Sequence, residues 1–447
     1  MAAELLLPHA ARAEVKIGLH GGIANNMYLF AKALASRGHD AMFIRDRSGL
    51  FGFSQPVWED ARFTLGYEQL WQTYQWTWAQ WAELEQRLQW SAPPWAADPF
   101  AHSAQAPLAV RSRVSAIDTR LLHAVGAGYT HWPITVDLMR QCDVLLVCGI
   151  ESEILALASG RPFGIWTHGG DLRTASGLHP PQTKTWRDWR YYVMRQRLLR
   201  MAFRRALFIG SYDPDGLGGH IGRIPKRYPI SRVNIPMEPH TRQPKAARRQ
   251  QLARVMAEIG AQAPDAEHVV FVPSRVDFYW KGIDRFLRAI ARIGFDSRLH
   301  VIVSGWGRDY DAAQSMVPPG SVTFLPHALS KPVLFDLFES VDLVVDQFLM
   351  GGYGTSALEA MSCGAPVLMW FNTEPVLAAG WDVPPVLNAR TDQEIAALLR
   401  DVLEGRIDLE ARGIELQRWQ QRVHGIDAVV PELVERLRQG LQAARSH

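Results

Sequence analysis

The sequence predicts an α/β protein of two doubly wound domains, each with a parallel sheet covered by helices. In both halves of the chain, short apolar runs of strand length alternate with stretches that have the helical period. Residues 234–244 contain three prolines in eleven residues, which is the composition of a linker between the halves. The length of 447 residues, 47% of them hydrophobic, is ample for two or three cores.

In the first half, the predicted elements follow one another in a regular order. An apolar strand at 15–20 leads through Gly21 and Gly22 into a helix at 26–37, which Gly38 ends, and the next strand is at 41–44. We expect further buried strands at 143–148, 162–167 and 206–209. These elements define an N-terminal domain, residues 1–235.

The second half repeats this order and defines a C-terminal domain, residues 236–426. Its predicted strands and helices alternate in the same way. The strands are expected at 268–273, 300–304, 321–325, 342–345 and 365–370, and the helices at 281–293 and 356–363. A last helix is predicted within the final segment, 427–447.

Composition and charge exclude several classes of protein. The 48 Lys and Arg residues nearly balance the 45 Asp and Glu residues, so a dedicated nucleic-acid binder is not expected. Three cysteines fit a reducing compartment better than a disulfide framework. The sequence has no apolar run of about 18 residues, which a spanning helix needs, and its first residues lack the apolar segment of a signal peptide. We expect a cytoplasmic protein, with attachment to the inner face of a membrane as the alternative.

A glycine-rich loop follows the predicted strand at 342–345. Glycines at 352 and 354 let the backbone approach a ligand closely, and the N–H groups of Thr355 and Ser356 at a helix N-terminus favour an anion. Glu359 lies in the same predicted helix. Ser356 and Glu359 also fit a capping box, in which the glutamate bonds to its own helix end.

The run from Asp342 to Pro366 resembles the nucleotide-sugar signature of GT-B glycosyltransferases, and most closely the retaining family 4. The resemblance implies two Rossmann-like domains that face each other across a cleft. It also implies that Glu359 binds the donor ribose and that the loop holds the rest of the donor through Gly352, Tyr353, Gly354, Thr355 and Ser356. Gly351 stands where the family has the first of two glutamates, the one that contacts the transferred sugar.

A second match lies at 271–284, which resembles the family's Gly-Arg…Lys-Gly segment. The resemblance implies that Arg275 and Lys281 hold the diphosphate and stabilise the charge of the leaving group without a metal. The alternative is a solvated loop with two surface cations. By the same resemblance, Gly305 and His327 belong to the donor site, His327 beside the base.

The N-terminal half carries candidates for the acceptor side of the cleft. Gly21 and Gly22 match the position of the family's glycine loop, although any tight turn between strand and helix favours glycine. The segment 166–171 resembles the family's His-Gly-x-Asp pattern, which implies that His168 binds sugar or acceptor and that Asp171 faces the cleft. The alternatives are that His168 caps a turn and Asp171 caps a helix.

Seven of the 16 tryptophans lie between Trp58 and Trp95, in a predicted insertion at ~55–100. The spacing of Trp71, Tyr74, Trp78 and Trp81 predicts one aromatic helical face. Core packing is the first interpretation of this face, and an acceptor-binding or membrane-binding surface is the second. The basic segment 184–205 predicts a helix that either lies on anionic lipid or is simply solvated.

The resemblance implies a glycosyltransferase that moves a sugar from a nucleotide sugar to a hydroxyl group with retention, and that needs no cofactor or metal. The acceptor is expected to be a glycan, a lipid-linked molecule or a protein, in polysaccharide, glycolipid or glycoprotein assembly. The final segment is expected to pack back on the N-terminal domain. Two alternatives remain: a catalytically silent partner or binding subunit, motivated by Gly351, and a sugar-nucleotide epimerase of related fold.

Overall fold

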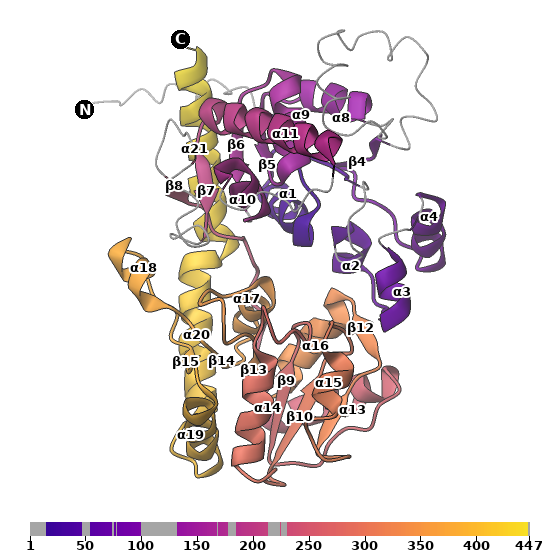
Figure 1. Ribbon diagram of the computed structural model, residues 1–447, viewed down its shortest axis with the longest axis vertical. Coiled ribbons are helices and arrows are strands. Elements are labelled where there is room, and N and C mark those ends of the chain that lie inside the picture. The colour runs from indigo at the N-terminus through magenta and orange to yellow at the C-terminus, as the bar shows by residue number, and fades with distance from the viewer. Residues whose placement is uncertain are drawn as a thin grey trace, which may run out of the picture.

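The computed structural model describes residues 15–46, 54–73, 76, 78–99, 132–167, 169–177, 185–212, 224 and 230–445. They form two lobes, one above the other in Figure 1, and the last helices of the chain run along both. Each lobe contains one parallel sheet with helices on its faces.

The sheet of the N-terminal lobe has seven strands in the order β4-β2-β1-β5-β6-β7-β8, all parallel. Every residue of its four central strands is buried, as expected for strands covered on both faces. The strands are β1 (Ile17–His20), β2 (Ala41–Ile44), β4 (Ala96–Ala97), β5 (Val144–Val147), β6 (Phe163–Trp166), β7 (Ile209–Ser211) and β8 (Ile230–Arg232). The helices beside it are α1 (Asn26–Ser36), α8 (Trp132–Arg140), α9 (Ile150–Ser159), α10 (Gly170–Ser176) and α11 (Trp186–Arg205).

The sheet of the C-terminal lobe has six parallel strands in the order β11-β10-β9-β13-β14-β15. Its strands are β9 (His268–Val272), β10 (Leu299–Val303), β11 (Val322–Phe324), β13 (Leu343–Val345), β14 (Val367–Met369) and β15 (Leu387–Asn388). The helices of this lobe are α13 (Lys245–Glu258), α14 (Ile283–Arg292), α15 (Tyr310–Gln314), α16 (Lys331–Ser340), α17 (Thr355–Ser362), α18 (Thr373–Ala378), α19 (Asp392–Leu403) and α20 (Leu409–His424).

The predicted strands and helices are present with small shifts at their ends, apart from the strand expected at 206–209. That strand begins only at Ile209, because residues 206–208 form the connection from α11, which ends at Arg205. The N–H group of Ala206 still donates to the carbonyl of Ala202 in the last turn of α11. Sequence hydropathy does not distinguish a buried helix end from the start of a strand.

The tryptophan-rich insertion forms short elements instead of one long helix. They are α2 (Pro56–Asp60), β3 (Thr64–Gly66), α3 (Tyr67–Gln72) and α4 (Trp78–Arg87). The prediction of a single aromatic helical face is therefore wrong, since the chain leaves the helix between Gln72 and Trp78. The side chains of Trp71, Tyr74 and Trp78 lie outside the described residues. Trp58 and Trp81 are each only 2% exposed, so these two belong to the core.

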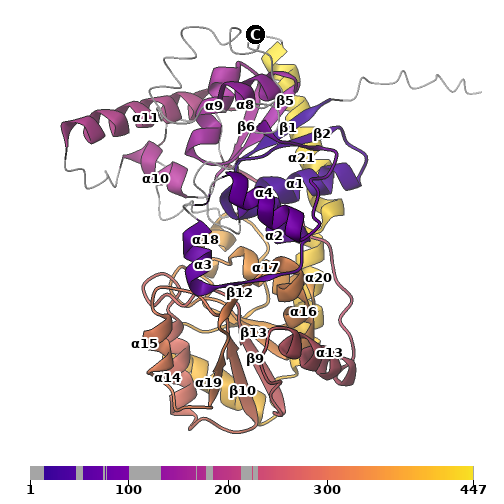
Figure 2. The ribbon, with the colours of Figure 1, turned by 90° about the vertical axis from the view of Figure 1, so that its right-hand side faces the viewer.

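The insertion joins the two lobes through a pair of strands. β3 lies antiparallel to β12 (His327–Leu329), with Leu65 opposite Ala328. The hydrogen bonding continues beyond the strands, because the Phe63 N–H donates to the Ser330 hydroxyl and the Ser330 N–H donates to the Phe63 carbonyl. In Figures 1 and 2, α3 and β12 lie at the level where the lobes meet. We call this feature the β3–β12 pair.

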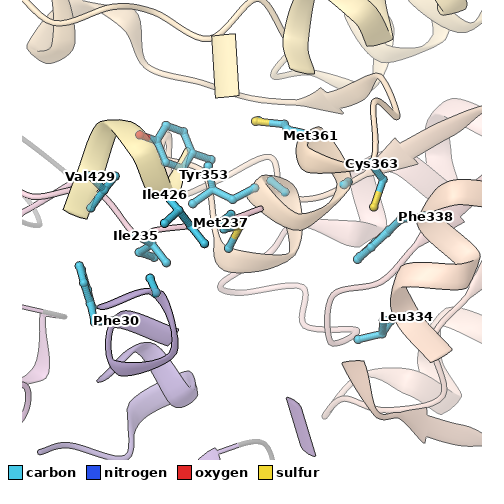
Figure 3. Close-up of a cluster of buried hydrophobic side chains, with 14 of the residues drawn as sticks. Phe30, Ile235, Met237, Leu334, Phe338, Tyr353, Met361, Cys363, Ile426 and Val429 are labelled. Carbon is cyan, nitrogen blue, oxygen red and sulfur yellow. The ribbon is translucent and has the colours of Figure 1, made fainter. Parts of the chain in front are cut away.

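The final helix, α21 (Ile426–Arg445), lies against the N-terminal lobe. Arg37 of α1 forms an ion pair with Asp427 at 2.7 Å, and Gly440 has no room for a side chain beside Leu207. A continuous apolar core links this helix to both lobes. Figure 3 shows it: Phe30 of α1 and Ile426 of α21 lie on one side, with Phe338 and Met361 of the C-terminal lobe on the other.

The basic segment is helical over Trp186–Arg205, as predicted. Its inner face buries Leu199 and Phe203, whereas Trp186 near its start is 72% exposed. Within the part of the chain that the structure describes, no helix combines the length and hydropathy required to cross a membrane.

Candidate functional site

A cavity of about 250 Å³ lies between the lobes, at the carboxyl ends of the strands of the C-terminal sheet. Most of its lining comes from loops of the C-terminal lobe, and two residues come from the N-terminal lobe. The lining residues are Ala24, Trp58, Pro273, Ser274, Arg275, Lys281, Ser304, Trp306, Ala328, Leu329, Lys331, Leu334, Thr355 and Ser356. We call it the donor cavity, because it brings together the predicted diphosphate cations and the predicted anion-binding helix end.

Arg275 and Lys281 line the donor cavity from the loop between β9 and α14. The Arg275 side chain is 43% exposed and only loosely paired, with its Nε 3.7 Å from Asp277. Lys281 is held more firmly, because its Nζ lies 3.1 Å from the buried carboxylate of Asp346. Two fixed cations facing one cavity suit a ligand with two negative charges.

The N-terminus of α17 meets these cations. The helix begins at Thr355 after the N-cap residue Gly354, whose N–H donates to Asp346 at 3.3 Å. A Cβ at Gly354 would lie 3.5 Å from the Lys281 Nζ, which shows how close the lysine is to the helix end. The first N–H groups of a helix have no partner within it and favour an anion.

Glu359 does not form the expected capping box, and its side chain is bonded to a lysine instead. Its side chain is buried, and its Oε1 accepts a hydrogen bond from Lys331 Nζ at the start of α16. The helix begins at Thr355, so Ser356 is not its N-cap and no capping box forms. Lys331 lines the donor cavity, whereas Glu359 lines a second cavity of about 210 Å³. The capping-box interpretation is therefore wrong, and a basic side chain stands between Glu359 and the donor cavity.

Glu359, Lys331 and Glu59 form an ionic cluster across the lobe boundary. Glu59 belongs to α2 of the N-terminal lobe and accepts a hydrogen bond from Asn25 at 3.2 Å. Burial raises the pKa of Glu59 to about 7 despite the attraction of Lys331. Burial also raises the pKa of Glu359. For Lys331, burial acts to lower the pKa, but the two carboxylates outweigh it and raise the pKa.

Glu59→Gln is expected to stabilise the protein at about pH 8 by roughly 1–2 kcal/mol and to have no effect near pH 4. The carboxyl group has a folded pKa of about 7 against 4.5 when free. Between those values the folded chain holds a proton that the unfolded chain has lost, so the wild type loses stability as pH rises. Urea unfolding across this range measures the difference. Glu83→Gln in α4, an exposed position, is the control, and a destabilised E59Q protein at pH 8 would contradict the expectation.

Tyr353 and Gly351 lie away from the donor cavity. The Tyr353 ring is 7% exposed and stacks on Phe371 and on Tyr212 of the N-terminal lobe, with its hydroxyl 3.1 Å from His424 Nε2. The ring therefore belongs to the core between the lobes. Gly351 has φ of +73°, which disfavours a glutamate, and a Cβ there would lie 3.0 Å from Asn372. Gly352 lines the same small cavity as Tyr353, separate from the donor cavity.

Gly305 and His327 have backbone roles at the edge of the donor cavity. A Cβ on Gly305 would collide with the carbonyl of Leu325, so only glycine fits against that strand end. The Gly305 N–H donates to the His327 carbonyl at 3.2 Å, and His327 begins β12. Their neighbours Trp306 and Ala328 line the cavity in their place.

The glycine loop of the N-terminal lobe reaches the donor cavity through Ala24, which follows the two glycines. Gly21 has φ of +142°, and a Cβ there would lie 2.2 Å from the Cys148 carbonyl, so the loop must pass close to β5. Gly22 is buried in the same turn. Ala24 lines the cavity, and both Ala24 and Asn25 have left-handed backbone angles. Strain of this kind is often found at ligand sites.

Asp171 is fully buried, in place of the predicted exposure in the cleft. Its Oδ1 accepts hydrogen bonds from the N–H groups of Gly169 and Leu172, so it orders its own loop. It lies beside Glu153, whose pKa is raised well above the usual value by burial and then by the charge of Asp171. Asp171 does not cap α10, which has Gly169 as its N-cap residue. His168 lies outside the described residues.

Sequence reasoning missed several groups that the fold brings to the site. Lys331 and Trp58 line the donor cavity, yet neither belongs to a recognised motif. Ser330 and Pro332 around Lys331 indicated only a helix start. The concentration of tryptophan at 58–95 was the one available signal for Trp58.

Comparison with known proteins matches one segment of the chain to a known family. Residues 267–404 match the family Glycosyl transferases group 1. The chain carries a group 1 glycosyltransferase domain. The motifs at 271–284 and 342–366 both lie within the matched segment. The matched segment includes Arg275, Lys281, Lys331 and Glu359.

Solved structures show the same fold over nearly the whole of this chain. HepE of Anabaena, in a crystal structure with UDP and glucose, is 14% identical with a TM-score of 0.57, over 94% of this chain and 98% of that one. Sucrose-phosphate synthase of Thermosynechococcus elongatus is 13% identical with a TM-score of 0.55, over 96% and 100%. The GT-B fold is thus confirmed. Among curated proteins no significant match was found.

Proposed function

We propose that this glycosyltransferase moves a sugar from a nucleoside diphosphate sugar to a hydroxyl acceptor, with retention at the anomeric carbon. One observation carries the proposal: Arg275, Lys281 and the N-terminus of α17 line one cavity between the lobes. The departing nucleoside diphosphate gains charge as the bond to the sugar breaks, and fixed cations stabilise that charge without a metal.

The proposed reaction takes place on one face of the sugar. The bond between the anomeric carbon and the diphosphate oxygen breaks, and the acceptor oxygen bonds to the same face. The acceptor proton passes to the departing phosphate oxygen.

His168 is proposed to bind the sugar or acceptor, and the acceptor is proposed to be a glycan, a lipid-linked molecule or a protein. Contact of α11 with an anionic membrane is proposed from its basic residues and exposed Trp186.

Calorimetry with UDP, GDP, ADP and dTDP tests the donor half of the proposal. We expect one of these to bind the full chain, and binding by none of them would overturn it. Incubation of the matching nucleotide sugars with the protein then identifies the donor sugar as the one whose nucleotide sugar yields free nucleoside diphosphate. Proton NMR of the transferred product assigns the anomeric configuration, and the same assay with EDTA tests the independence from metal.

A catalytically silent subunit is the second candidate, and Gly351 motivates it. The left-handed backbone at this residue shows a loop shaped for glycine, not one that has simply lost a side chain. Nucleotide binding without any release of diphosphate from any donor, in the presence of acceptor extracts, would favour this candidate over the enzyme.

A further inference from the structure

Lys331 is a third cation of the donor cavity, and its surroundings differ from those of Arg275. It is only 9% exposed and is the first residue of α16, directly after the β3–β12 pair. One of its three N–H groups donates to Glu359, which leaves the others for a ligand. Lys331 lines the donor cavity and Glu359 does not, so a ligand that fills the cavity meets the lysine before it meets Glu359.

The position of Lys331 beside α17 indicates which part of the donor it meets. The helix N-terminus at Thr355 lies beside Lys281, so the diphosphate belongs there. Glu359 is four residues further, about 6 Å along the helix axis. Lys331 is bonded to Glu359, so its ammonium group lies roughly one helical turn beyond the phosphate end. In a nucleotide, the distance between the phosphates and the ribose hydroxyl groups is similar to this separation.

We propose that Lys331 binds the ribose hydroxyl groups of the donor nucleotide, and that Glu359 and Glu59 are positioning residues that hold its side chain. This inference rests on the proposed donor site and deepens it. Hydroxyl oxygens accept hydrogen bonds from an ammonium group, and a charged donor strengthens such bonds. Because Glu59 comes from the N-terminal lobe, the ribose contact depends on how the two lobes are joined.

The test compares ribonucleotides with deoxyribonucleotides. Calorimetry on the full chain uses UDP, GDP and ADP, the 2′-deoxy form of each, and inorganic pyrophosphate. The wild type is expected to bind the ribonucleotide about tenfold more tightly than its 2′-deoxy form, which is the contribution of one charge-assisted hydrogen bond. Lys331→Met is expected to abolish that preference and to leave pyrophosphate affinity unchanged.

Two further variants distinguish the loss of a ribose contact from a loss of folding stability. Lys331→Met leaves the buried Glu359 unpaired, which is destabilising, so the double variant K331M/E359Q removes both charges together. It should lose the ribose preference in the same way while its melting temperature stays closer to that of the wild type. Lys245→Met, a change at an exposed lysine of the same lobe, is the control and should change nothing.

The outcomes separate this inference from the proposed function. If the wild type binds no nucleotide, the donor site itself is wrong and the inference falls with it. If the wild type binds and the Lys331 variants keep the ribose preference, only the inference is overturned. A uniform loss that includes pyrophosphate would place Lys331 at the phosphates and would overturn the ribose contact. Glu359→Gln and Glu59→Gln should each reduce the preference without removing it.

Discussion

Trp58→Ala is expected to lower the free energy of unfolding by about 3–5 kcal/mol, because it empties a large buried site. Trp58 packs edge to face on Phe63, with ring centroids 5.1 Å apart, and contacts Leu65 and Ala328 in one apolar cluster. The cluster joins the insertion to β12, so the loss falls on the contact between the lobes. The side chain also lines the donor cavity, and nucleotide affinity should fall with stability.

Guanidinium unfolding and calorimetry measure the two effects of this change. Trp186→Ala is the control, since that side chain is 72% exposed and its removal should cost less than about 0.5 kcal/mol. Trp58→Phe should retain part of the packing and give an intermediate loss. Equal stability of the two alanine variants would show that the insertion does not anchor the lobes.

Arg275→Gln is expected to weaken nucleoside diphosphate binding by about 10-fold to 100-fold, the value of one hydrogen bond to a charged group of roughly 1.5–3 kcal/mol. Arg275 is a better probe than Lys281, because the buried Asp346 depends on Lys281 and would be left without its cation. The Arg275 side chain has only a loose contact with Asp277, so its removal leaves the loop intact.

Arg308→Gln is the matched control for Arg275. Both guanidinium groups lie near Asp277, with Arg308 Nη2 at 3.3 Å from its Oδ1, but only Arg275 lines the donor cavity. Calorimetry with the bound nucleotide should show normal affinity for R308Q and weak affinity for R275Q. Pyrophosphate should be affected in the same ratio as the nucleotide. Equal losses in the two variants would assign the effect to the loop and not to a phosphate contact.

Local sequence patterns predicted the sheets and the helix ends better than they predicted side-chain partners. Strand 41–44 has the same bounds in the structure, because its buried apolar run lies between polar residues. The loop after β13 and the start of α17 were likewise predictable, since glycine spacing and the following apolar residues act over a few positions. These features depend on interactions within a single βα unit.

The partners of Glu359 and Asp171 depend on the tertiary fold instead. Lys331 is 28 positions from Glu359 and reaches it only because α16 packs beside α17. Asp171 looked like a cleft residue from its motif, yet its loop turns the carboxylate inward beside Glu153. The aromatic spacing at Trp71 to Trp81 suggested one helix, whereas the chain forms two, and the insertion that holds them is tied to the other lobe by the pairing of β3 with β12. No local pattern records such a long-range pairing.

The β3–β12 pair has a consequence for how the chain folds. Phe63 and Ser330 are 267 positions apart in sequence, so this contact closes a loop that holds most of the N-terminal domain and about half of the C-terminal domain. Closing so long a loop costs conformational entropy before the hydrogen bonds between the strands can form. We therefore expect the pair to form late in folding. Until then β12 presents an unpaired strand edge, a hazard for aggregation during synthesis. A C-terminal domain expressed alone would retain that exposed edge permanently.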